Sequence, residues 1–165
     1  MEAAAQQFAR VAKRWVLVFS DVESTADWRR ALEAAGLDYV RTGAWIKAGS
    51  TPQFTGDRPA TGFEAITICH QPGRKRWNGG GSHAVWEFPI VLNRSGPRLH
   101  TTQKPLALMQ RLVDLFTDPG ELIGDPFAGS ATTLVAATSL GRRSVGWERD
   151  SAFYEVARRR LAGEE

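Results

Sequence analysis

Two acids mark a stretch whose residue types suit the binding of a nucleotide. Asp125 follows a short apolar segment predicted to be a buried strand, and it opens the turn 125–129, whose sequence is DPFAG. Ser130 is expected to cap the helix that follows, and 143–147 is predicted to be a second strand that ends at Glu148. This order of strand, tight turn, helix, strand and acid is that of a nucleotide-binding half-sheet, in which the acid reaches the ribose hydroxyls.

The turn favours a cationic cofactor over a dinucleotide. A dinucleotide fold uses glycines in the pattern G-x-G-x-x-G so that the backbone can approach a pyrophosphate, whereas Gly129 is the lone glycine between residues 126 and 133. The carboxylate of Asp125 would repel a phosphate, but it suits a ligand that carries a sulfonium and a free amino group. These residues therefore favour S-adenosylmethionine. The alternative is a strand-to-helix turn that binds no ligand.

The composition is that of an ordinary globular protein. Of the 165 residues, 42% are apolar and 24% are charged. The sequence has neither an apolar run of the roughly 20 residues that span a membrane nor the start of a signal peptide, so we expect no membrane partner and a cytoplasmic location. The net charge of +3 permits an anionic partner. The single cysteine, Cys69, is expected to be buried, and the scattered histidines predict no metal site.

The other elements are predicted from the spacing of apolar residues. Helices are expected through Phe8, Val11, Ala12 and Trp15, between Ser24 and Gly36, from Leu106 to Thr117, through Leu134, Val135 and Thr138 as far as Gly141, and through Phe153, Val156, Ala157 and Leu161. Strands are expected at 15–19, 39–47, 63–70, 122–123 and 143–147, with a long loop at 48–62. The continuous apolar run 15–19 indicates a central parallel strand. One α/β domain with a mostly parallel sheet is the expected architecture.

Two motifs together resemble a known family. The segments 100–109, HTTQKPLALM, and 125–130, DPFAGS, are similar to those of the amino-group DNA methyltransferases that modify adenine N6 or cytosine N4, in the β arrangement of that family. The resemblance implies a Rossmann-like S-adenosylmethionine-dependent methyltransferase fold, with a mostly parallel sheet flanked by helices, as a single partial domain over 1–165. Within it, 48–100 would be a loop-rich region facing the DNA target, and 100–165 would be the cofactor-binding half.

The resemblance also implies which residues contact the cofactor. They are Thr102, Gln103, Lys104, Asp125, Phe127, Gly129, Ser130, Thr132 and Glu148. Thr102, Gln103 and Lys104 would line the methionine end, and Glu148 would bind the ribose hydroxyls. The sequence departs from the family at Ala131, where glycine is usual, so that a methyl group stands at a close backbone approach.

The catalytic loop of the family has no counterpart in this sequence. That loop reads Asp, Asn or Ser, then Pro-Pro and an aromatic residue, and no such tetrapeptide occurs among the 165 residues. In the family it hydrogen-bonds the amine of a flipped base. We therefore assign no catalytic residue and expect a truncated or incomplete DNA methyltransferase that resembles the carboxy-terminal two-thirds of the family. The alternative is a non-catalytic remnant that binds S-adenosylmethionine or DNA, or a subunit completed by another chain.

The catalytic strand that accompanies this loop is expected to be missing too. It would lie between the strands at Trp15 and Leu122, in the middle of the sheet. Those two strands are expected either to pair directly or to lie in a split sheet with an exposed apolar edge. Because exposed apolar surface recruits partners, we expect a homodimer or a completing chain.

Basic residues beside an aromatic residue indicate a contact with DNA. Arg74, Lys75, Arg76 and Trp77 precede three glycines, and this combination suits a phosphate backbone and an unstacked base. The alternative is a solvated loop with one partly buried tryptophan. Residues 158–160, all arginine, are predicted to form a solvated face of the last helix.

Overall fold

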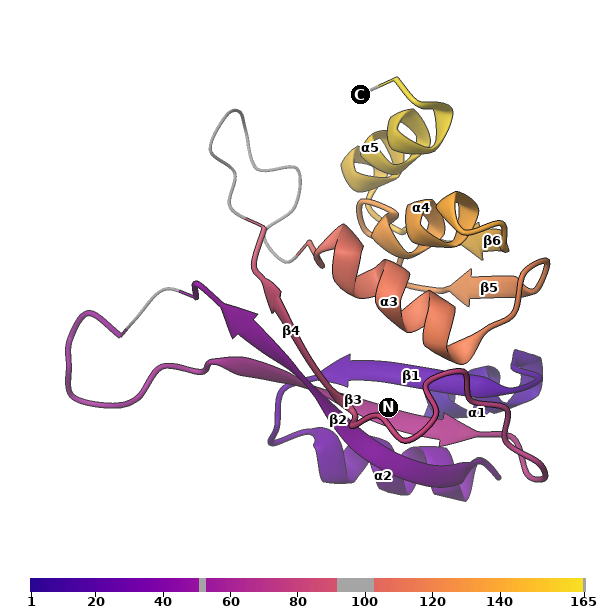
Figure 1. Ribbon diagram of the computed structural model, residues 1–165, viewed down its shortest axis with the longest axis horizontal. Coiled ribbons are helices and arrows are strands. Elements are labelled where there is room, and N and C mark those ends of the chain that lie inside the picture. Colours follow the sequence, from indigo (N-terminus) through magenta and orange to yellow (C-terminus); the bar gives the residue numbers. More distant parts are fainter. Residues whose placement is uncertain (51–52, 92–102, 165) are drawn as a thin grey trace. The chain divides into compact units, whose positions relative to one another are not determined.

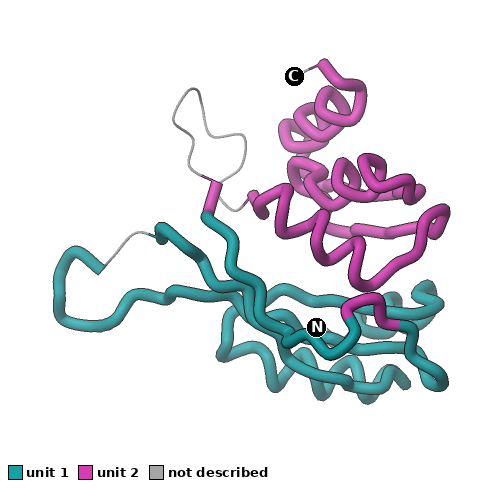
Figure 2. Tube along the Cα trace, in the orientation of Figure 1, with its two compact units in different colours: residues 1–76, 80–89 teal, residues 77–79, 90–165 magenta. Residues whose placement is uncertain are grey.

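The computed structural model (Figure 1) describes residues 1–50, 53–91 and 103–164. The chain divides into two compact units, which Figure 2 shows in different colours. Unit 1 comprises Met1–Arg76 and Gly80–Pro89, and unit 2 comprises Trp77–Gly79 and Ile90–Glu165. The predicted organisation as a single domain, with a target-facing region at 48–100 and a cofactor-binding half at 100–165, stays a prediction.

Unit 1 is a sheet of four strands with two helices. Its elements are α1 (Glu2–Val11), β1 (Trp15–Ser20), α2 (Thr25–Ala34), β2 (Asp38–Ala48), β3 (Phe63–His70) and β4 (Val85–Pro89), and the strand order is β1-β3-β2-β4. Helix α2 packs against β2 and β3, and α1 packs against α2. The core between them contains Leu32 and Cys69, both fully buried. The prediction that Cys69 is buried is therefore confirmed, and burial raises the pKa of its thiol to about 11.

The prediction that residues 15–19 form a central parallel strand is wrong. Strand β1 lies at an edge of the four-stranded sheet and pairs antiparallel with β3, with Trp15 opposite His70. The crossover through α2 makes β1 and β2 run in the same direction, but β3 enters between them and is antiparallel to both. Parallel pairing occurs between β2 and β4 and between β5 and β6. A continuous apolar run does not determine strand direction, and within this one Val16 alone is buried.

Unit 2 carries the strand–turn–helix–strand segment. Its elements are α3 (Leu106–Phe116), β5 (Leu122–Asp125), α4 (Thr132–Ser139), β6 (Arg143–Gly146) and α5 (Ser151–Ala162). Strands β5 and β6 are parallel, with Leu122 opposite Arg143 and Asp125 opposite Gly146. Helix α4 packs against α3, β5 and β6. The predicted βαβ arrangement is confirmed, and it places Asp125 and Glu148 after the carboxyl ends of neighbouring strands.

Some residues predicted to be inward-facing are exposed. Val11 is 61% exposed at the end of α1, and Leu161 is 45% exposed near the end of α5. Thr138 is also exposed, and α4 buries Ala136 and Ala137 instead. Residues at the ends of short helices have neighbours on one side only, so the apolar spacing overstates their burial.

The strands at Trp15 and Leu122 lie in separate sheets, because β1 belongs to the four-stranded sheet and β5 to the two-stranded one. Of the two predicted arrangements, the split sheet is confirmed. Alternate residues of the two-stranded sheet are exposed: Leu122 by 58%, Val145 by 37% and Trp147, just past β6, by 60%. Within the described residues, no helix has both the length and the apolar character that a bilayer crossing requires.

Candidate functional site

The turn after β5 is closed by hydrogen bonds around Asp125. Its carboxylate Oδ1 accepts from the Phe127 amide at 3.0 Å. The Trp147 amide donates to the Asp125 carbonyl at 3.0 Å, and the Ala128 amide donates to the Trp147 carbonyl at 3.0 Å. The pairing of β5 with β6 therefore continues past the ends of both strands. It holds the turn at the carboxyl edge of the sheet, where α/β proteins bind their ligands.

Glu148 joins this turn to the end of β6. One carboxylate oxygen accepts from the Gly129 amide at 2.8 Å, and the other accepts from the Asp150 amide at 2.8 Å. The amide of Asp150 is the main cause that holds the pKa of Glu148 below its ordinary value of 4.5, and the amide of Gly129 adds to it. The structure therefore brings together Gly129 and Glu148, two predicted cofactor contacts. The ionised carboxylate of Glu148 joins the turn after β5 to the segment before α5.

Ala131 has a left-handed backbone, with φ 60° and ψ 28°, and its side chain is fully buried. This conformation costs a residue with a Cβ about 1–2 kcal/mol relative to a right-handed one. Among the described non-glycine residues, no other has a positive φ. This geometry explains why glycine suits this position. Because alanine disfavours it, other contacts of the turn must stabilise the left-handed backbone of Ala131.

The prediction that Ser130 caps α4 is wrong. The helix begins at Thr132, its N-cap residue is Ala131, and no side chain bonds to the amides of its first turn. A capping residue needs an extended backbone, and the left-handed Ala131 takes that place. Ser130 itself is buried, with 3% of its surface exposed.

Arg160 of α5 forms hydrogen bonds with the segment that joins the turn after β5 to α4. Its Nη1 donates to the Ser130 carbonyl, and it also donates to Thr132 Oγ1 at 3.3 Å. The prediction that Arg160 belongs to a solvated face is therefore wrong, although Arg158 and Arg159 are exposed as predicted. The side chain of Arg160 is instead half-buried between α5 and the start of α4.

The spacing of α5 contains the signal that identifies Arg160. The residue follows Phe153 by seven positions and Ala157 by three, so it lies on the same face of the helix as these inward residues. A long basic side chain on an inward face needs an acceptor, because a buried charge is costly when it is unpaired. The carbonyl of Ser130 is that acceptor.

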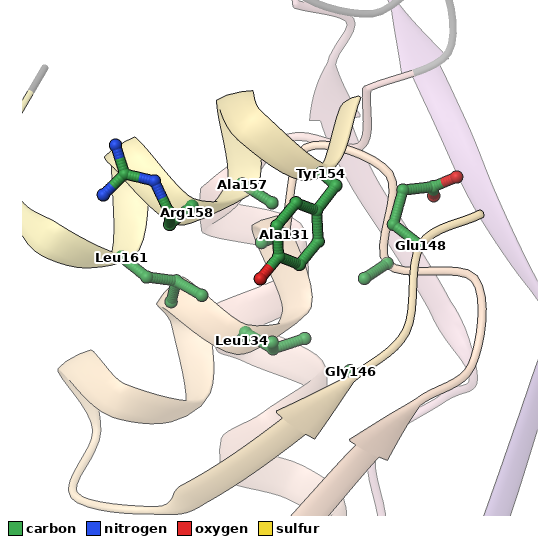
Figure 3. Close-up of a pocket in the computed structure, with 9 residues that line it drawn as sticks. Ala131, Leu134, Gly146, Glu148, Tyr154, Ala157, Arg158 and Leu161 are labelled. Atoms are coloured by element: carbon green, nitrogen blue, oxygen red, sulfur yellow. The ribbon is translucent and has the colours of Figure 1, made fainter. Parts of the chain in front are cut away.

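A cavity of about 190 Å³ lies between α4, β6 and α5 (Figure 3). Its walls are mainly apolar, with Leu134 and Leu161 on one side and Tyr154 beside them. Figure 3 shows the carboxylate of Glu148 directed away from Leu134 and Leu161. Sites for ligands of nucleoside size span about 300–1,000 Å³, so this cavity by itself is too small to be the cofactor site.

The remaining predicted cofactor contacts are more dispersed. Gln103 and Lys104 lie directly before α3 and are half-buried. The ring of Phe127 is 72% exposed in the turn. Thr132 is buried, and its hydroxyl accepts from Arg160, whereas Thr102 lies outside the described residues. The roles of these residues toward the cofactor stay predictions.

The basic segment before the glycines has contacts within unit 1. Lys75 Nζ lies 2.7 Å from Asp38 Oδ2 in an ion pair, and the carbonyl of Arg76 accepts from Trp15 Nε1 at 2.7 Å. Arg74 is exposed. The segment therefore has an ordered backbone, and its contact with DNA stays a prediction.

Trp77, the aromatic residue of that segment, packs in unit 2. Its ring meets that of Phe116 edge to face, with centroids 4.9 Å apart. The next residue, Asn78, donates through its side-chain amide to the carbonyls of Asp114 and Thr117 at 3.0 and 2.9 Å. Trp77 is half-buried, and its contact with DNA stays a prediction.

Known proteins share this sequence in part. The model of the DNA methylase family N6_N4_Mtase matches residues 14–159. The type II methyltransferase M.HindIII of Haemophilus influenzae is 48% identical over 62 residues, which are 38% of this chain and 20% of that protein. The type II methyltransferase M.HinfI of Haemophilus influenzae is 26% identical over 134 residues, covering 71% of this chain and 37% of that protein. The chain thus spans well under half the length of these curated relatives.

Solved structures share the fold over nearly the whole chain. The M1.HpyAVI–SAM complex is 24% identical with a TM-score of 0.82, covering 95% of this chain and 79% of that one. TTHA0409 of Thermus thermophilus, complexed with S-adenosyl-L-methionine, is 23% identical with a TM-score of 0.77, covering 99% of this chain and 75% of that one. These likenesses show a Rossmann-like fold of the S-adenosylmethionine-dependent methyltransferases. The family match over most of the sequence shows that the chain belongs to the DNA methylase family N6_N4_Mtase.

Proposed function

We propose that this chain is the cofactor-binding part of an S-adenosylmethionine-dependent DNA methyltransferase that acts on adenine N6 or cytosine N4. The observation that carries the proposal is the 2.8 Å hydrogen bond from the Gly129 amide to Glu148, which joins the turn after β5 to the acid after β6. Membership of the DNA methylase family supports DNA as the substrate. The structural neighbours that hold S-adenosylmethionine support the cofactor.

The residues of the turn fit this cofactor. An ionised carboxylate offers about four acceptor sites, and Glu148 uses one on each oxygen for a backbone amide. Two ribose hydroxyls can therefore bind to it without displacing the turn. Asp125 uses one oxygen for the Phe127 amide, and its negative charge suits the amino group of the methionine end. When bound, S-adenosylmethionine supplies the methyl group that the reaction transfers.

The proposal leaves the handling of the base to a segment outside this sequence. A base in a duplex has to be extruded before its amine can react, and the Pro-Pro tetrapeptide that holds such a base in the family does not occur here. We therefore assign no catalytic residue. Within the chain, Arg74, Lys75 and Arg76 are the proposed contacts to DNA phosphates, where each cation would release counterions.

Calorimetric titration with S-adenosylmethionine, followed by a methyl-transfer assay on DNA, tests the proposal. We expect the chain to bind the cofactor, to transfer no methyl group by itself, and to transfer methyl groups once a polypeptide carrying the Pro-Pro loop is added. Binding without transfer under both conditions favours the non-catalytic remnant named below. A complete lack of binding contradicts both.

The second candidate is a non-catalytic remnant, or a subunit that another copy or another chain completes. It is favoured by the two-stranded sheet of unit 2, in which Leu122 and Val145 are 58% and 37% exposed, and by Trp147 just past β6, which is 60% exposed. Sheets of two strands are marginally stable alone, and exposed apolar patches mark interfaces. Completion by another chain would cover these side chains.

Light scattering after gel filtration tests the self-association that this candidate includes. We expect the apparent mass to rise with concentration and a Leu122→Ser variant to shift the equilibrium toward the monomer. Val22→Ser is the control, because Val22 is 45% exposed in unit 1. A wild-type monomer at every concentration contradicts the homodimer.

A further inference from the structure

The peptide group between Ser130 and Ala131 is bonded at both of its polar ends. Its carbonyl accepts from Arg160 Nη1, and its N–H donates to the Ala128 carbonyl at 2.7 Å. Ser130 and Ala131 are 3% and 0% exposed, so water is not at hand to replace either partner. The orientation of this peptide group therefore depends on two protein contacts, of which one comes from α5.

This orientation sets the left-handed backbone of Ala131. A residue with a Cβ prefers a negative φ, whereas φ of Ala131 is 60°. Rotating the peptide group by half a turn would release Ala131 from that region and point the Ser130 carbonyl away from α5. It would also break the hydrogen bond to Ala128. A strained backbone persists only where its surroundings hold it, and the guanidinium of Arg160 is part of those surroundings.

We propose that Arg160 is a positioning residue for the cofactor turn. Its guanidinium holds the Ser130 carbonyl, and thereby the left-handed Ala131, so that the turn keeps the Gly129 amide, two peptide groups earlier, directed at Glu148. The second bond, to Thr132 Oγ1 at 3.3 Å, fixes the guanidinium against the first residue of α4. Both bonds come from the same nitrogen, Nη1, whose two hydrogens can serve two acceptors. The effect on cofactor binding rests on the proposed function.

Arg159 supplies the matched control for Arg160. Both arginines lie in the last turn of α5, where a positive charge favours the carboxyl end of a helix. Arg159 is exposed, whereas Arg160 is half-buried and reaches Ser130. Replacing either by glutamine removes one charge from the same helical turn, so a difference between the two variants reports the bond to the cofactor turn.

The first test is calorimetric titration of the two variants with S-adenosylmethionine. Loss of a charge-assisted bond predicts that Arg160→Gln binds about tenfold more weakly than wild type. Arg159→Gln is expected to bind within about twofold, because an exposed charge contributes little. Arg160→Lys keeps a charged donor but not the geometry of the guanidinium, and it is expected to lie between Arg160→Gln and wild type. Equal affinities for Arg159→Gln and Arg160→Gln would overturn the proposal.

The second test needs no cofactor. Amide hydrogen exchange followed by NMR is expected to show faster exchange of the Ala131 amide in Arg160→Gln, and in Arg160→Lys should the glutamine variant not fold. In Arg159→Gln the rate should stay that of wild type. Unchanged protection of Ala131 in the Arg160 variants would overturn the proposal. A wild-type protein that binds no S-adenosylmethionine contradicts the proposed function and leaves this exchange result as the test of Arg160.

The third test asks whether Arg160 acts through the backbone of Ala131. Glycine adopts a left-handed backbone without strain, so an Ala131→Gly chain needs less help to keep the turn in place. Arg160→Gln is therefore expected to lose a smaller factor in affinity, and less amide protection, in the Ala131→Gly background than in wild type. The same loss in both backgrounds would show that Arg160 acts by another route.

Discussion

Glu148 links two parts of the candidate site through hydrogen bonds, although its position just past a strand predicts an exposed acid. Its two oxygens accept from amides on both sides, one in the turn after β5 and one at Asp150, the residue before α5. The side chain of Asp150 in turn caps α5 by accepting from the Ala152 and Phe153 amides. One carboxylate therefore orders the turn and the entry to the last helix.

The pKa of Glu148 gives a prediction about acid conditions. Because its folded pKa lies below 4.5, the ionised carboxylate contributes stability above about pH 4.5, and this contribution is lost as the pH falls through the lowered pKa. We expect the melting temperature of wild type to fall more steeply below about pH 4.5 than that of Glu148→Gln. Melting curves followed by circular dichroism at a series of pH values measure this difference.

Glu155→Gln is the control for Glu148→Gln. The pKa of Glu155 is also lowered, by its hydrogen bond with Arg158, but this residue is exposed on α5 and has no bond to the turn. At neutral pH we expect Glu148→Gln to bind S-adenosylmethionine about tenfold more weakly than wild type, and Glu155→Gln to bind as wild type does. Equal affinities for the two variants would contradict the role of Glu148 in the site.

The sequence predicts the acids of the site better than the residues that hold the turn. Asp125 lies at the end of one strand and Glu148 follows another. Because the ends of neighbouring parallel strands meet at one edge of a sheet, residue types and spacing suffice to predict that the two acids lie close together. The backbone of Ala131 and the bond from Arg160 are tertiary features. Alanine prefers a right-handed backbone, so the sequence does not predict the left-handed conformation of Ala131. Three consecutive arginines indicate a solvated helix face, and only the helical spacing from Phe153 and Ala157 places Arg160 on the inward side.

At the scale of elements, α4 lies close to β6 because residue 146 has no side chain. A Cβ at Gly146 would stand 2.9 Å from Leu134 Cδ1 and 3.1 Å from Ala128 Cβ. Leu134 can rotate, but the Cβ of Ala128 is fixed to the cofactor turn. We therefore expect Gly146→Ala to lower the free energy of unfolding by about 1–3 kcal/mol, the usual cost of overpacking, as measured by urea denaturation.

Gly124→Ala is the matched control in the neighbouring strand. Gly124 pairs with Val145 of β6, and a Cβ added there would meet no atom within 4 Å. This variant should keep the stability of wild type or gain slightly, since alanine restricts the unfolded chain more than glycine does. Equal losses in the free energy of unfolding for Gly146→Ala and Gly124→Ala would contradict the view that close packing of α4 on β6 requires glycine at position 146.

Apolar spacing predicts the elements more reliably than their pairing. Strand β3 and helix α3 lie where the spacing places them, because each has a long uninterrupted pattern. The direction of β1 could not be read from its residues, since it depends on β3 entering between β1 and β2. The short strand β4 was absent from the predicted elements, because its five residues, VWEFP, form no long apolar pattern and end in proline.

At the scale of the whole chain, the described strands form a four-stranded and a two-stranded sheet. A split sheet was one of the two arrangements expected from the sequence, because no Pro-Pro tetrapeptide occurs in it. The exposure of Leu122 was not expected, since a short apolar segment ahead of the turn indicates a buried strand. The turn between β5 and α4 lies in unit 2, where Trp147 and Glu148 after β6 and Arg160 of α5 form hydrogen bonds with it.

The most direct test is calorimetric titration of S-adenosylmethionine into wild type, Asp125→Ala and Asp27→Ala. Asp27→Ala is the control, because Asp27 is exposed on α2 in unit 1. We predict that wild type and Asp27→Ala bind with equal affinity, and that Asp125→Ala binds about tenfold more weakly or worse, because it loses both a charge and the bond that closes the turn. Wild-type protein that binds no S-adenosylmethionine, or an Asp125→Ala protein that binds it as tightly as wild type, would contradict the assignment of the cofactor to the turn between β5 and α4.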